Sequence, residues 1–193
     1  MEKDLFEKKI ESEDIFCGKV IHLFKDTVEL PDGNTSTREY IKHVGAVCVV
    51  PVTDEGEIVC VRQFRYAIGR VMLEIPAGKL DFVGEDPEAA VIRELREETG
   101  ATCKSLKFIG KYLGSPALLD ENIWVYLAEG LEFGETDFDD DEFLKIEKIP
   151  VDELVEKILS GEVEDGKTQA AVLKAAVLIN RDKKEAQVSD KLI

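Results

Sequence analysis

The stretch Gly78-Lys-Leu-Asp-Phe-Val-Gly-Glu-Asp-Pro-Glu-Ala-Ala-Val-Ile-Arg-Glu-Leu-Arg-Glu-Glu-Thr-Gly-Ala101 carries the signals from which the fold is predicted. Its second half predicts a helix over Pro87–Thr99. Asp86 fits the N-cap position and Pro87 the first helical position, where a missing amide hydrogen costs nothing. Gly100 fits the C′ position, which favours a left-handed backbone. We therefore expect a helix with well-defined ends directly after a loop.

This helix carries three glutamates, Glu94, Glu97 and Glu98. Glu94 lies three positions before Glu97 and four before Glu98, so the three share one side of the helix. Like charges at such spacing destabilise an isolated helix by about 0.2–0.5 kcal/mol per pair. One interpretation is a solvated charged face. The other is a cation site, because the apolar, Gly/Pro-containing segment Leu73–Gly78 would bring a strand end and a loop to these carboxylates. Carboxylate and carbonyl oxygens suit Mg²⁺ or Mn²⁺.

The remaining pattern predicts an α/β fold with a mixed central sheet and a small N-terminal β extension. Strand signals run through residues 15–65, including the continuous apolar run Val44–Val52, and return at residues 105–113, 122–128 and 143–149. Two further helices are predicted over residues 151–160 and 168–180. The expected organisation is an N-terminal β extension over residues 1–43, a core domain over 44–180 and a polar tail over 181–193.

Composition excludes several classes of protein. The formal net charge is −16, from 41 acidic and 25 basic residues, which disfavours binding to nucleic acid or to an anionic membrane. A small anionic substrate would need a divalent cation or a few well-placed arginines. No apolar run approaches the roughly 20 residues of a membrane span, and the charged start of the chain lacks the pattern of a signal peptide. A cytoplasmic protein is expected, and the four scattered cysteines predict neither a disulfide nor a metal site.

The quoted stretch resembles the Nudix box, in which a glycine, a spacer and a glutamate precede Arg-Glu-apolar-x-Glu-Glu-x-Gly-apolar. From Glu85 onward the spacing matches fully, through Arg93 and the three glutamates to Ala101. The spacer between Gly78 and Glu85 has six residues where the family usually has five. The resemblance implies a Nudix-type α/β/α sandwich and hydrolysis of a nucleoside diphosphate linked to another group.

Three features outside the box resemble the ADP-ribose pyrophosphatase branch of this family. The segments Arg62-Gln-Phe-Arg65 and Leu73–Asp81 are similar to the strand and loop that enter the box in that branch. Pro116 follows Gly100 by sixteen residues, and Gly166-Lys-Thr-Gln-Ala-Ala is similar to the start of the branch's closing helix. The resemblance implies conversion of ADP-ribose and water into AMP and ribose 5-phosphate.

The same resemblance implies the roles of individual residues. The metal, Mg²⁺ or Mn²⁺, is assigned to three carboxylates and one backbone carbonyl: Glu94, Glu97, Glu98 and Ala77. Catalytic roles fall to Glu97, to Arg93 as a support for the carboxylates, and to a general base in the acidic loop 135–142, with Glu142 first and Asp141 second. Substrate binding is assigned to Arg38, Arg65, Glu74 and Pro116.

The branch also implies a homodimer in which the N-terminal sheet is exchanged between subunits. The partners expected are therefore a small nucleotide and a second copy of the chain. Two rival functions stay open. One is hydrolysis of another nucleoside diphosphate compound, such as a nucleotide sugar. The other is a nucleotide-sensing module without activity, which the complete set of box glutamates disfavours.

Overall fold

The computed structural model describes residues 3–137 and 143–189. The chain forms two compact units. One contains the chain up to Gly45 together with Leu113–Asn122, and the other contains the remainder.

The first unit holds a short 3₁₀ helix, η1 (Lys3–Leu5), and an antiparallel sheet in the order β1-β2-β3. Its strands are β1 (Lys8–Cys17), β2 (His22–Glu29) and β3 (Thr35–Lys42). Most of β1 precedes the predicted strand region, because its charged sequence lacks a regular apolar alternation. Its pairing along the whole of β2 supplies the backbone hydrogen bonds that local propensity does not predict.

The loop Leu113–Asn122, which is distant in sequence from β3, completes this unit. The Ile41 amide donates to the Leu118 carbonyl at 2.8 Å, and the Asp120 amide donates to the Ile41 carbonyl at 3.2 Å. The Asp120 carboxylate also accepts the His43 amide at 2.6 Å. These contacts attach the loop that contains Pro116 to the end of β3.

The second unit is built on a seven-stranded mixed sheet with the main order β10-β5-β4-β9-β8. Strands β4 (Ala46–Val52) and β9 (Ile123–Phe133) are parallel, whereas β8 (Ala101–Tyr112) and β10 (Lys145–Pro150) pair antiparallel with their neighbours. Two short strands join off this path: β6 (Arg70–Glu74) pairs with β5 (Glu57–Arg65), and β7 (Ala77–Lys79) pairs with β4. A 3₁₀ turn, η2 (Tyr66–Ile68), connects β5 to β6.

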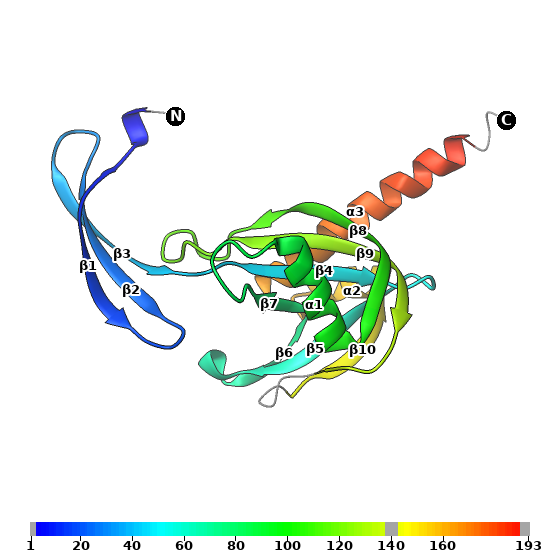
Figure 1. The fold of residues 1–193 in the computed structure, drawn as a ribbon. Helices are drawn as coiled ribbons and strands as arrows, with labels where there is room; N and C mark the ends of the chain where they lie inside the picture. Colours follow the sequence, from blue (N-terminus) through cyan, green and yellow to red (C-terminus); the bar gives the residue numbers. More distant parts are fainter. Residues whose placement is uncertain (1–2, 138–142, 190–193) are drawn as a thin grey trace. The chain divides into compact units, whose positions relative to one another are not determined.

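Helices cover both faces of this sheet (Figure 1). Alternate residues of β4 point to opposite faces. Cys48 and Val50 pack in a cluster with α2 (Val151–Leu159) and α3 (Gly166–Ser189), while Val47 and Val49 pack with α1 (Pro87–Thr99). The unit is an α/β/α sandwich with a mixed central sheet, which confirms the predicted fold class. The thiols of Cys48 and Cys60 lie in this core, where burial raises the pKa of each to about 12.

The helices differ from prediction mainly in α3. The bounds of α1 match, but α3 starts at Gly166 and continues to Ser189, past the predicted end at Asn180. No glycine or proline interrupts residues 167–189, and ion pairs of Asp182 with Lys107 and of Arg181 with Glu185 accompany the extension. Within the described ranges, no helix combines the length and hydropathy of a membrane span.

Candidate active site

Helix α1 is fixed at both ends by local interactions. The Asp86 side chain accepts the Glu88 amide at 3.2 Å, and Gly100, with φ of 69°, donates its amide to the Arg96 carbonyl at 2.8 Å. Between these ends, Val91 and Leu95 are buried against the sheet. The burial of this apolar face sets the rotation of the helix and thereby the direction of its glutamates.

Glu94 lies directly over the backbone of β7. Glu94 is 9% exposed, and a Cβ atom built at Gly78 would overlap the Glu94 carboxylate. Since every other residue type carries a Cβ, the position of Glu94 requires glycine at 78. This contact explains the glycine that opens the box.

Glu98 reaches the neighbouring residue of the same strand. Its carboxylate accepts the Ala77 amide at 3.1 Å, and the residue is 2% exposed. Glu94 and Glu98 are thus both brought to Ala77–Gly78, as expected if the carboxylates and this backbone segment act together.

Arg93 connects the box glutamates to the loop before the helix. Its guanidinium donates to Glu94 at 2.7 Å and to Glu97 at 3.2 Å, and it lies 3.5 Å from Asp81 and 3.7 Å from Glu85. The contact with Glu94 is the shorter of the two hydrogen bonds. One guanidinium among four carboxylates leaves an excess of negative charge, which favours a bound cation.

The extra residue of the spacer is accommodated in an exposed turn. The Asp81 amide donates to the Glu85 carboxylate at 2.7 Å, and Phe82 and Val83 project to solvent between them. Leu80 remains buried in the core. The departure from the usual spacing therefore leaves α1 and β7 in contact.

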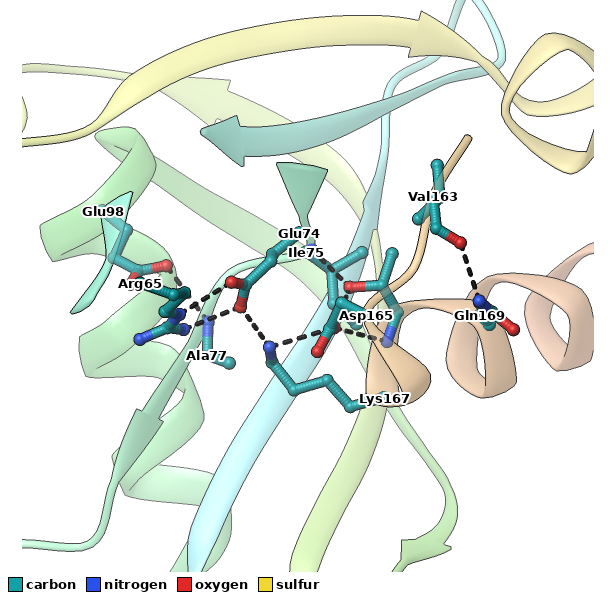
Figure 2. Close-up of polar contacts among 10 residues, drawn as sticks. Arg65, Glu74, Ile75, Ala77, Glu98, Val163, Asp165, Lys167 and Gln169 are labelled. Atoms are coloured by element: carbon teal, nitrogen blue, oxygen red, sulfur yellow. Dashed lines mark hydrogen bonds and ion pairs between the residues drawn. The ribbon is translucent and has the colours of Figure 1, made fainter. Parts of the chain in front are cut away.

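A second polar group surrounds Glu74 at the end of β6 (Figure 2). Arg65 donates to both of its oxygens at 2.7 Å, and Lys167 of α3 forms an ion pair with it. The Glu74 side chain is only 2% exposed, whereas that of Arg65 is 42% exposed. Burial alone favours the neutral acid, but Arg65 and Lys167 hold the pKa of Glu74 below its ordinary value.

This group lies close enough to the box for the charges to interact. The hydrogen bond from Arg65 to Glu74 raises the pKa of the guanidinium most, against the effect of burial, and the charges of Asp165 and Glu98 raise it further. Bidentate pairing fixes the plane of the Arg65 guanidinium. A partly exposed, oriented arginine beside Glu98 is suited to contact an anionic ligand.

The oxygen donors fit a hard dication. Glu94, Glu98 and the Ala77 backbone lie together, and the donors are the carboxylate and carbonyl types that Mg²⁺ prefers. Over residues 3–137 and 143–189, no three His, Cys, Asp or Glu side chains already form a group that could hold a metal ion. Glu94 and Glu97 both accept hydrogen bonds from the same nitrogen of Arg93, at 2.7 Å and 3.2 Å.

Arg38 and Pro116 belong to the first unit, where Arg38 pairs with Glu7 at 2.5 Å. Glu142 and Asp141, the candidate bases, lie outside the described residues. Lys167 and its neighbours in α3 were assigned no role from the sequence. The only signal for them was the likeness of Gly166–Ala171 to a closing helix.

Comparisons with known proteins identify relatives over most of the chain. The NUDIX domain model matches residues 42–172, and the model of the nucleoside diphosphate sugar hydrolase N-terminal domain matches residues 7–41. An ADP-ribose pyrophosphatase of Bacillus subtilis is 47% identical, covering 88% of this chain and 92% of that protein. A methanol dehydrogenase activator of Bacillus methanolicus is 43% identical, with 87% and 92% covered.

A solved structure supports the fold independently. The crystal structure of an ADP compounds hydrolase superposes with a TM-score of 0.80 at 19% identity, covering 91% of this chain and 95% of that one. The fold, the Gly78–Ala101 motif and the match over residues 42–172 lead to one conclusion: the chain belongs to the NUDIX domain family.

Proposed function

We propose that the protein hydrolyses the pyrophosphate bond of ADP-ribose to give AMP and ribose 5-phosphate. The observation that carries the proposal is the convergence of Glu94 and Glu98 on Ala77–Gly78, with the oriented Arg65 nearby. The similarity to an ADP-ribose pyrophosphatase at 47% identity supports this choice of substrate.

The proposed metal is Mg²⁺, with Mn²⁺ as the alternative, held by Glu94, Glu98, the Ala77 carbonyl and Glu97. When bound, it would neutralise the diphosphate and lower the pKa of a coordinated water. Glu97 also accepts a hydrogen bond from Arg93, at 3.2 Å. Arg93 orients Glu94 through the 2.7 Å hydrogen bond and balances part of the negative charge.

Substrate binding is proposed for Arg38, Arg65, Glu74 and Pro116. Arg65 would contact a phosphate oxygen, because it is partly exposed and its plane is fixed. Glu74 acts through Arg65, since its own carboxylate is buried beneath the guanidinium. Arg38 and Pro116, both exposed, are proposed from the resemblance to the branch.

Glu142 is the proposed general base and Asp141 the alternative. The base takes a proton from the attacking water as the new P–O bond forms and the bridging P–O bond breaks. We expect E142Q to lower kcat roughly 100- to 10,000-fold with a smaller effect on metal affinity. Parallel kinetics of D141N provide the control. If D141N loses activity and E142Q does not, the base is Asp141.

Hydrolysis of a nucleotide sugar is the second candidate. It is favoured by the match of residues 7–41 to the N-terminal domain of nucleoside diphosphate sugar hydrolases. Measuring kcat/KM with Mg²⁺ across ADP-ribose, ADP-glucose, GDP-mannose and NADH separates the two. A clear preference for ADP-ribose supports the first proposal, whereas a preference for a sugar nucleotide replaces it with the second.

A homodimer in the cytoplasm is proposed as the working form. Strand β1 is an edge strand whose Ile10, Ile15 and Phe16 are all exposed, and a second copy of the N-terminal sheet would cover them. Light scattering during size-exclusion chromatography should give the mass of two chains. A mass of one chain at micromolar concentration would contradict this proposal.

A further inference from the structure

The first turn of α3 contacts the chain at the end of β6 and directly after it. Thr168 is completely buried, and its hydroxyl accepts the Ile75 amide at 3.0 Å. The same hydroxyl donates to the Asp165 carboxylate at 2.5 Å. Because its single proton is committed to Asp165, a lone pair of the oxygen remains for the Ile75 amide.

Lys167 holds the residue just before Ile75. It pairs with Glu74 and lies 3.0 Å from Asp165, and its side chain is 12% exposed. Asp165 therefore joins Lys167 and Thr168, and these two in turn hold adjacent residues, Glu74 at the end of β6 and Ile75 directly after it (Figure 2). Two neighbouring contacts restrain both the position and the direction of this short segment.

The other end of the segment is held by the box helix. Glu98 accepts the Ala77 amide at 3.1 Å, and the Pro76 carbonyl accepts the Val49 amide of β4 at 3.0 Å. The segment Glu74–Ala77 is thus fixed by α1, β4 and α3 together. A displacement at Ile75 would move Ala77 at one end and, through Glu74, the Arg65 guanidinium at the other.

Helix capping alone does not account for this arrangement. Asp165 already accepts the Thr168 amide at 2.9 Å, which is the N-cap interaction. In addition, the Thr168 hydroxyl and the Lys167 ammonium contact residues outside the helix, Ile75 and Glu74. We propose that Thr168 and Lys167 are positioning residues for hydrolysis, which fix Ala77 and Arg65 relative to the box glutamates.

This inference rests on the proposed hydrolase function, and Thr168 gives its sharpest test. T168V removes the hydroxyl with little change of volume and leaves the Ile75 amide without its partner. T168S keeps the hydroxyl. Q169A is the matched control, because Gln169 lies on the same turn but its side chain donates to the Val163 carbonyl at 2.7 Å.

Hydrogen exchange of the Ile75 and Ala77 amides, and kcat and KM for ADP-ribose with Mg²⁺, are measured on the full chain. We expect both amides to exchange faster in T168V. We also expect its kcat to fall roughly 10- to 100-fold, since misplacement of a catalytic group by about 1 Å can lower the rate 100-fold. KM should change less. T168S and Q169A should resemble the wild type in both measurements.

Wild-type kcat in T168V, or unchanged exchange at Ile75, would overturn the inference. An equal loss in Q169A would also overturn it, because the effect would then be a general one of the helix turn. If circular dichroism shows that T168V is unfolded, T168A removes the same hydroxyl without a branched replacement. A wild-type protein that leaves ADP-ribose intact refutes the proposed function, while amide exchange still decides whether Thr168 fixes the segment.

Discussion

Replacing Glu98 with glutamine is expected to lower kcat for ADP-ribose by roughly 100- to 1,000-fold, a loss of about 3–4 kcal/mol of transition-state stabilisation. Glutamine keeps a side-chain oxygen that can accept the Ala77 amide, so the contact of α1 with β7 survives. It removes the negative charge, however, and a neutral amide is a weaker ligand for Mg²⁺. The fold should therefore persist while metal-dependent turnover is lost.

The control for this variant is E88Q. Glu88 lies in the first turn of the same helix and is exposed, so E88Q removes the same charge ten positions before Glu98. Steady-state kinetics over a range of Mg²⁺ concentrations, with thermal unfolding as the check on folding, should separate the two variants. Turnover of E98Q near that of E88Q would contradict the proposal that Glu98 binds the metal.

Replacing Gly78 with alanine should also abolish most activity, although it adds one methyl group. The new Cβ would occupy the space of the Glu94 carboxylate, so the glutamate must swing away from β7. Glu94 is a flexible side chain and Gly78 does not have a positive φ, so the backbone can stay in place. We expect a drop of at least about 100-fold in kcat, as for other displaced catalytic groups, with little change in the melting temperature.

G56A provides the opposite signature and serves as the control. Gly56 has a φ of 80° with open space around it, so alanine there strains the backbone by about 1–2 kcal/mol. G56A should melt earlier and retain kcat, whereas G78A should retain stability and lose kcat. A fully active G78A would show that the position of Glu94 over Gly78 is not needed for catalysis.

Elements whose signals lie within their own residues were predicted accurately, and elements that depend on distant segments were not. Helix α1 was predicted with its observed bounds, because Asp86, Pro87 and Gly100 act within their own turns. Strand β4 was recognisable from its continuous apolar run, which both helical layers bury. In contrast, β1 depends on pairing with β2, and β6 and β7 are short strands that the sequence did not separate from a loop.

The candidate site likewise contains features that local sequence predicts and features that depend on distant segments. The spacing of Glu94, Glu97 and Glu98 on one helix could be predicted because helical geometry determines it. The contact of Glu94 with Gly78 and the link from Ile75 to Thr168, 93 positions away, depend on how the sheet places separate segments. No local pattern encodes those contacts.

Product analysis of ADP-ribose incubated with the full chain, with and without Mg²⁺, tests the central claim most directly. The proposed function predicts equal amounts of AMP and ribose 5-phosphate when Mg²⁺ is present, and no cleavage after it is chelated. ADP-ribose that stays intact with Mg²⁺, or cleavage that yields ADP and free ribose, would contradict it.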